Sequence, residues 1–117
     1  MNFVEAVVCE DGHSLRLALP NAPVLQIAQS RRPGESVVAG LRPEYLIVAE
    51  GNEPNAMTLP LALVEQTGGM AFAVTDTEPS LTITASLRRD IGRQITVTIA
   101  PERIHLFHPE TGQSLAP

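Results

Sequence analysis

The stretch Gly40-Leu41-Arg42-Pro43-Glu44-Tyr45 forms a polar corner between two runs of alternating apolar residues. Pro43 fixes its own φ and keeps Arg42 out of the helical region, so the chain must arrive extended and turn at Glu44. Gly40 can adopt a positive φ or let another backbone come close. Taken alone, the stretch is best explained as a strand-to-turn junction with a solvated arginine and glutamate, not as a reaction centre.

Outward from this corner, short alternating apolar runs are separated by turn residues, and ten prolines and eight glycines supply the turns. The expected strands are 2–10, 13–19, 24–28, 37–41, 46–48, 58–66, 70–76, 81–87, 95–99 and 104–107. No stretch has a helical period of useful length, although single turns fit 42–45 and 101–103, where proline suits a first helical position. Short, evenly spaced strands predict an all-β barrel or sandwich.

Several apolar positions are expected to face the core. Leu59, Leu61 and Leu63 stand in step along one strand, and Pro60 between them predicts an edge position or a bulge. Phe72 shares a face with its apolar neighbours two residues away, and Phe72→Ala should cost about 3–5 kcal/mol if the ring is fully buried. The polar stretch 50–55 predicts a mobile loop or a seam between two subregions.

Composition excludes several classes of function. The chain has 117 residues, enough for one domain with a single core, and its 44% apolar content excludes a disordered chain. All eight basic residues are arginines against thirteen carboxylates. Without lysine there is no GxxxxGK[ST] phosphate loop and no Schiff-base chemistry. The net charge of −5 and the few aromatic residues disfavour nucleic acid as a partner.

The same features predict a soluble, cytoplasmic protein. No apolar run approaches the roughly 18 residues needed to cross a bilayer, and the first residues do not resemble a secretory signal. Cys9 is the only cysteine, so no internal disulfide can form. We expect Cys9 to be a small core or near-core residue.

Candidate catalytic groups are weak. His105 and His108 would lie on opposite faces of a strand and could not share a metal ion. The stretch 76–78 reads Asp-Thr-Glu where an aspartic protease needs Asp-Thr-Gly, and 110–112 reads Glu-Thr-Gly with the wrong acid, so a protease is only a remote alternative. The pairs 31–32 and 88–89, both Arg-Arg, predict local anion contacts or solvated strand flanks. We expect no catalytic residue, no metal and no cofactor.

Five pieces of the chain together are similar to a known pattern, in the same order. They are Met1-Asn2-Phe3, Gly40-Leu41-Arg42-Pro43-Glu44, Val64-Glu65-Gln66-Thr67-Gly68, Gly92, and Ile104-His105-Leu106-Phe107 with Glu110-Thr111-Gly112-Gln113. Through them the chain resembles the C-terminal regulatory region of the ATPase subunits of bacterial ABC importers, of the maltose and sn-glycerol-3-phosphate type. That region contains the transport-associated OB, or TOBE, fold. Tyr45 replaces the family's histidine, Thr67 its leucine and His108 its aspartate.

The resemblance implies an all-β, OB-fold-like (TOBE) barrel of short antiparallel strands, with the N-terminal strands packing as a second OB-like lobe. It divides the single regulatory region 1–117 into N-terminal OB-like strands, 1–39, and a TOBE part, 40–117. The ATPase motifs would lie upstream, and Met1 would be an internal residue of a longer parent chain. The implied location is cytoplasmic, at the inner face of the bacterial membrane through the transporter.

The implied function is noncatalytic regulation and dimerisation of an importer ATPase for sugar or glycerol-phosphate-type solutes. The implied partners are a second copy, the ATPase domain of the same chain, the permease subunits and a regulatory protein. The expected structural residues of the family motifs are Gly40, Arg42, Pro43, Glu44, Glu65, Gly68, Gly92, His105, Phe107, Thr111 and Gly112. Arg42 and Glu44 should order the corner through local hydrogen bonds, and Phe107 should anchor the last strand. An alternative is a module that binds a small oxyanion or sugar through Arg42, Arg88 or Arg89.

Overall fold

The computed structural model describes residues 1–67, 70–85 and 92–115, and the regular structure in them is strand apart from two single turns of 3-10 helix. The elements are β1 (Asn2–Val8), β2 (Ser14–Leu17), β3 (Val24–Gln26), β4 (Ser36–Leu41), η1 (Pro43–Tyr45), β5 (Ile47–Val48), β6 (Met57–Thr67), β7 (Met70–Thr75), β8 (Thr82–Ala85), β9 (Gln94–Thr98), η2 (Pro101–Arg103) and β10 (His105–Phe107). The all-β class and both proline-initiated turns predicted from the sequence are confirmed.

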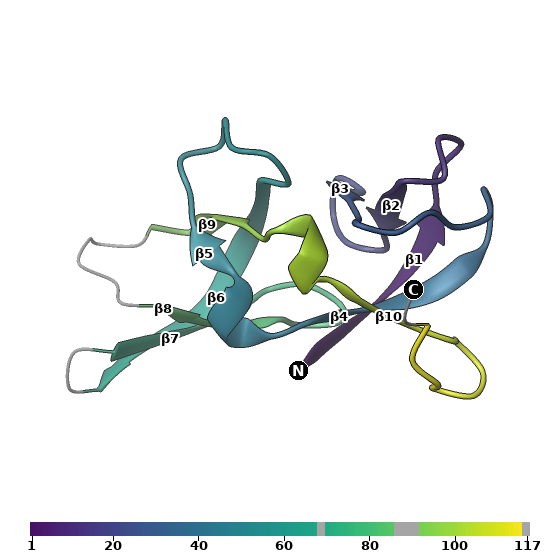
Figure 1. The fold of residues 1–117 in the computed structure, drawn as a ribbon. Helices are drawn as coiled ribbons and strands as arrows, with labels where there is room; N and C mark the ends of the chain where they lie inside the picture. Colours follow the sequence, from purple (N-terminus) through teal and green to yellow (C-terminus); the bar gives the residue numbers. More distant parts are fainter. Residues whose placement is uncertain (68–69, 86–91, 116–117) are drawn as a thin grey trace.

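The strands form two five-stranded sheets, with the orders β10-β4-β1-β2-β3 and β5-β9-β6-β7-β8. The two sheets lie side by side, and the chain crosses between them twice (Figure 1). Every pairing between the described strands is antiparallel. The two orders are the same when β1, β2, β3 and β4 are matched with β6, β7, β8 and β9, and β10 is matched with β5. The sheets are therefore related by an internal repeat.

Each sheet is completed by a strand that follows the other sheet in the chain. β5 comes directly after β4 and η1 but pairs with β9, whereas β10 comes after β9 and η2 but pairs with β4. Neither sheet is therefore formed by one contiguous segment. The division of the chain at residues 39 and 40 stays a prediction, and the last strand belongs to the N-terminal sheet.

The two crossovers repeat the same local structure. In each, an extended residue precedes a Pro-Glu pair, and an N–H closes the turn on the proline carbonyl: Leu46 on Pro43 and Ile104 on Pro101, both at 3.2 Å. Proline suits this first position because its missing N–H would be unpaired there anyway. Both closing residues are buried, so each turn carries the chain into the core of the other sheet.

Two buried asparagines cap the edge strands β3 and β8 across the seam between the sheets. Asn2 exchanges two hydrogen bonds with the backbone of Thr82 in β8, both 2.9 Å long. Asn55 accepts from the N–H of Gln26 in β3 at 2.7 Å and donates to its carbonyl at 3.0 Å. Asn55 also donates to the carbonyl of Ile99 at 3.0 Å. Since β3 and β8 hold equivalent places, the two contacts are reciprocal.

The buried apolar side chains form one core cluster that includes residues of both sheets. Its members are Val4, Ala6, Val8, Leu15, Leu17, Leu19, Leu25, Ile27, Val37, Ala39, Leu41, Leu46, Met57, Leu59, Ala73, Leu81, Ile83, Ile95, Val97, Ile99, Ile104 and Leu106. The alternation predicted for strands 13–19, 81–87 and 95–99 is therefore confirmed at the described positions. Cys9 is half-buried.

Two expected core positions are wrong. The pairing of β6 with β7 shifts between Leu61 and Leu63, one residue after Pro60, as in a β-bulge. Because one extra residue moves the following side chains to the other face, Leu63 is 50% exposed. Phe72 is 41% exposed, and its neighbour Ala73 is buried instead. Phe72→Ala therefore removes less buried surface than the fully buried case assumed.

Asn55→Ala should lower the free energy of unfolding by about 2–4 kcal/mol, because it leaves without partners the buried carbonyl of Ile99 and the partly buried N–H and carbonyl of Gln26. Asn55 also has a positive φ of 61°, which alanine tolerates less well. Urea denaturation measures the change. Asn52→Ala, in the same loop but exposed, is the control and should change stability by less than about 0.5 kcal/mol. Equal effects of the two substitutions would show that Asn55 does not join the sheets.

Candidate functional site

Three of the motif residues meet on the outer face of the first sheet. Gly40 in β4 is paired with Phe3 of β1 on one side and with His105 of β10 on the other. A Cβ added to Gly40 would lie 2.6 Å from Met1 Sδ and 2.6 Å from Phe107 Cε2. Gly40 is therefore needed for close approach, and it is side chains rather than another backbone that approach it.

An exposed apolar surface covers this glycine. The rings of Phe3 and Phe107 meet edge to face, with centroids 5.7 Å apart and an interplanar angle of 70°. Phe3, Met1 and Val7 are exposed, and Phe107 is half-buried. We call Met1, Phe3, Val7 and Phe107 the outer patch. Apolar side chains gathered on one sheet face are typical of an interaction surface.

A groove of about 580 Å³ adjoins the outer patch on the same face. Its lining includes the exposed side chains of Glu5 on β1 and Arg16 on β2. Neither of these two forms an ion pair with another described residue. Sequence reasoning missed both residues, although their polar positions alternate with the buried positions of β1 and β2.

The corner after β4 is held mainly by its backbone. The N–H of Tyr45 donates to the carbonyl of Arg42 at 3.0 Å. The side chains of Arg42 and Glu44 approach to 3.7 Å, and both are about half exposed, so their ion pair contributes little to stability. The guanidinium carbon of Arg103 lies 4.4 Å from the centroid of the Tyr45 ring. Tyr45 and Arg103 hold equivalent places in the two crossovers, which therefore contact each other.

The loop after β10 explains two further motif residues. Gly112 has a positive φ of 73°, and its N–H donates to the His108 carbonyl at 2.9 Å. The hydroxyl oxygen of Thr111 accepts from the N–H of Gln113 at 3.2 Å. His108 Nδ1 accepts from the N–H groups of Glu110 and Thr111, at 3.1 and 3.3 Å. The imidazole thus caps the turn and is used structurally.

The remaining motif residues do not join the outer patch. Pro43 begins η1. Glu65 is exposed on β6, where it is paired with Phe72 of β7, and Gly92 is exposed before β9. Gly68 lies outside the described residues. The structure therefore gathers Gly40, His105 and Phe107 and leaves Glu65 and Gly92 on the other sheet.

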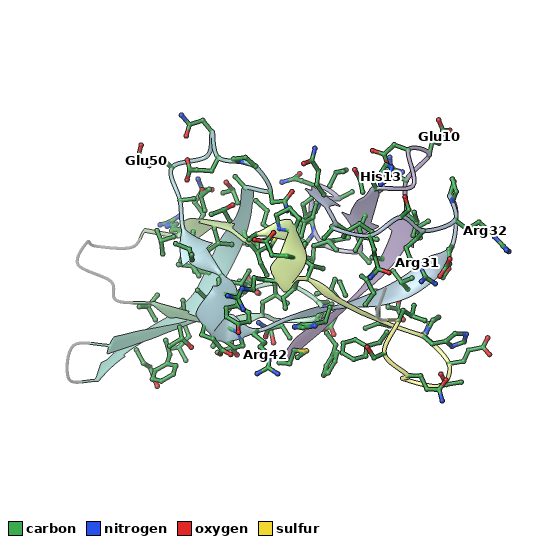
Figure 2. All side chains as sticks on the ribbon, viewed as in Figure 1. Glu10, His13, Arg31, Arg32, Arg42 and Glu50 are labelled. Carbon is green, nitrogen blue, oxygen red and sulfur yellow. The ribbon has the colours of Figure 1, made fainter. Side chains whose placement is uncertain are left out.

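A separate group of charges lies at one end of the first sheet, as the labels in Figure 2 show. Asp11 Oδ1 accepts from the N–H of His13 and Oδ2 from the Ser14 hydroxyl, both at 2.9 Å, and these bonds lower the pKa of Asp11. Arg31 Nη2 donates to Glu35 Oε2 at 2.6 Å, which lowers the pKa of Glu35. The anion that Arg31 contacts is thus an internal carboxylate. Arg88 and Arg89 lie outside the described residues.

The other candidate chemistry has a structural explanation in the described residues. Between Asp76 and Glu78, the hydroxyl of Thr77 contacts the Thr75 hydroxyl at 2.7 Å and donates to the Pro79 carbonyl at 2.6 Å. These bonds order the turn into β8. In residues 1–67, 70–85 and 92–115, no three His, Cys, Asp or Glu residues are grouped to hold a metal ion. No helix in this part of the chain is long and apolar enough to cross a bilayer.

Sequence comparison relates the chain to transport proteins. Residues 1–46 match the family model of the MalK OB fold domain. The sn-glycerol-3-phosphate import ATP-binding protein UgpC of Ruegeria pomeroyi is 31% identical over 121 residues, covering 99% of this chain and 32% of that protein. The sulfoquinovosyl glycerol transport ATP-binding protein SmoE of Agrobacterium fabrum is 27% identical over 124 residues, covering 98% of this chain and 33% of that protein. The chain spans about a third of the length of these relatives.

Structure comparison finds the same architecture in a solved protein. The chain is similar to the cytoplasmic molybdate-binding protein ModG, crystallised with molybdate bound, with a TM-score of 0.70. The match covers 92% of this chain and 96% of that one, at 14% sequence identity. At this identity the similarity shows the fold alone. It confirms the OB-type fold expected from the sequence.

Gly40→Ala should lower the free energy of unfolding by about 1–3 kcal/mol, because the new methyl group displaces Phe107 and Met1. Thermal or urea unfolding measures the loss. Gly92→Ala is the matched control, since no atom of the described residues beyond its chain neighbours lies within 4 Å of the added Cβ, and it should be nearly neutral. If Gly40→Ala were as mild as Gly92→Ala, close packing over β4 would not be the reason for the glycine.

Proposed function

Because residues 1–46 match the family model of the MalK OB fold domain, we propose that the chain is a noncatalytic regulatory and dimerisation region of an ABC importer ATP-binding subunit. The solutes would be of the sugar or glycerol-phosphate type, as in the names of the two relatives. The region would act on the cytoplasmic face of the membrane. Its partners would be an ATPase domain of the same parent chain, the permease subunits, a second copy and a regulatory protein.

The outer patch with its adjoining groove is the observation that supports self-association best. A two-fold interface brings the same surface of both copies together, so it must be complementary to itself. This face offers apolar side chains beside an acid, Glu5, and a base, Arg16, neither of which is paired with another described residue. In a two-fold arrangement, Glu5 of one copy can pair with Arg16 of the other, twice, around a shared apolar centre. That arrangement accounts for both the exposed rings and the opposite charges.

Charge reversal tests the dimer. Arg16→Glu should weaken self-association of the full chain by about tenfold, because it places like charges opposite each other across the interface. Glu5→Arg should do the same, and the double variant should restore association. Analytical ultracentrifugation over a range of concentrations measures it.

Arg93→Glu is the matched control. Arg93 is exposed and directly precedes β9 of the second sheet, so its reversal should leave association unchanged. If the double variant associated no more strongly than either single variant, the pairing of Glu5 with Arg16 would be excluded. A chain that stays monomeric at every concentration would exclude dimerisation through this face by the isolated region.

The importer role is tested with a chimera. The third of the Ruegeria pomeroyi protein that this chain matches is replaced by residues 1–117, and glycerol-3-phosphate uptake is measured in cells that lack the native subunit. We expect uptake to be retained, because a rigid accessory region of the same fold should preserve the assembly. A chimera that is produced and binds ATP but supports no uptake would contradict the proposal.

A second candidate function is binding of a small oxyanion or sugar, which is favoured by the fold shared with a molybdate-binding protein. Arg42 is the one described candidate ligand, and it is already paired with Glu44. Calorimetric titration with molybdate, sulfate, glycerol phosphate and sugars separates the two functions, since only a ligand-binding module produces saturable heat.

A further inference from the structure

The two exchanged strands, β5 and β10, differ at their outer edges. Beside β10 the chain folds back, so that Phe107 bridges Ser114 and the N–H of Leu115 donates to the Leu106 carbonyl at 2.8 Å. Leu115 packs against the core, and Leu106 is only 2% exposed. Residues 114–115 thus cover the open edge of the first sheet with one antiparallel bridge.

The equivalent edge of the second sheet is uncovered. Val48 in β5 corresponds to Leu106 in β10. Val48 is paired with the buried Val97 of β9, and Leu106 is paired with the buried Ala39 of β4. Yet Val48 is 46% exposed, and its neighbour Ile47 is 62% exposed. Among the described residues, none pairs with β5 on the side away from β9.

The backbone of β5 is oriented to accept another strand. The N–H of Ala49 donates to the Thr96 carbonyl at 2.8 Å, so residue 49 bonds toward β9. In an antiparallel pair, alternate residues bond to opposite sides. The N–H and carbonyl of Val48 therefore point to the open edge, in the orientation that lets the Leu106 carbonyl receive Leu115 in the other sheet.

The surroundings of this edge carry negative charge. Glu50 and Glu53 follow β5, and Glu53 Oε2 accepts from the N–H of Glu50 at 2.8 Å. Neither forms an ion pair with another described residue. Glu50 lies on the loop that rises from β5 (Figure 2). A segment that carries a basic side chain at this end would complement the charge.

We propose that the outer edge of β5 is a docking site for an extended peptide segment of a partner protein, which adds to the second sheet as an antiparallel strand. An aliphatic residue of the segment covers Val48, as Leu115 covers Leu106. A basic residue two positions before it lies opposite Glu50. Strand addition to an open edge gives main-chain hydrogen bonds, and alternate side chains give specificity. The site rests on the internal repeat and goes beyond the importer role, so it stands if that role fails.

The test uses the full chain labelled with ¹⁵N and the heptapeptide Thr-Gly-Arg-Ser-Leu-Ala-Pro, which is the chain's own 111–117 sequence with arginine at the third position. We expect saturable amide shifts centred on residues 47–49. The unchanged 111–117 sequence should bind about threefold more weakly, because it lacks the contact with Glu50. Added salt should remove that difference.

Two variants address the edge itself. Val48→Pro removes the N–H that points outward while leaving the bonds to β9, and should abolish the shifts. Val48→Thr keeps the strand and removes the apolar contact, and should weaken binding if the proline variant does not fold. Val24→Thr, at an exposed valine on edge strand β3, is the matched control and should bind as the parent does.

Three outcomes would overturn the proposal. The first is no saturable shift at residues 47–49 with millimolar peptide. The second is a response centred on β10, which would mean that the peptide only displaces the chain's own C-terminal segment. The third is a shift at residues 47–49 that depends on protein concentration without peptide, which would assign this edge to a second copy.

Discussion

The exchange of the fifth strand between the two sheets is the constraint on which the rest of the structure depends. The outer neighbour of β4 is β10, which follows the second sheet in the chain. The outer neighbour of β9 is β5, which follows the first sheet. The two Pro-Glu turns make this geometry available at little cost, because proline already has the φ that a first turn requires. Since each sheet contains a strand from the other half, neither is complete without the other.

The polar contacts at the seam and at the two crossovers differ in how much they contribute to stability. The hydrogen bonds of Asn2 and Asn55 satisfy buried or partly buried backbone groups, and leaving such groups unpaired costs desolvation free energy. The ion pair of Arg42 with Glu44 is exposed, and the stacking of Arg103 on Tyr45 is worth about 0.5–1 kcal/mol at such a site. The buried amides therefore decide how the sheets are held, and the charged side chains add little. This explains why charged surface residues are free to serve contacts with other molecules.

Local signals in the sequence were enough to predict the strands and both proline turns, because these depend on residues only a few positions apart. The partner of β10 is not a local property, and nothing near residue 105 reports that it pairs with β4. The bulge after Pro60 was anticipated, but a shift by one residue reverses every later face of β6, so Leu63 was placed in the core wrongly. Phe72 was placed there from the alternation of positions 70, 72 and 74, whereas β7 turns Ala73 and Thr75 inward. Gly40 was identified by pattern, whereas its role depends on how Met1 and Phe107 pack over it. Asn2 and Asn55 were missed, although each stands two residues before the first buried apolar residue of its strand.

The return of β10 also determines the order in which the molecule can be completed during synthesis. On the ribosome, residues 2–41 emerge before the rest of this region, but the outer edge of β4 has no neighbour until residues 105–107 have been made. Contacts between residues so far apart in the chain form slowly, and an unpaired edge invites association with other chains in the meantime. Residues 105–107 thus complete the sheet that residues 2–41 begin, and a product that stops before them would leave the outer edge of β4 unpaired.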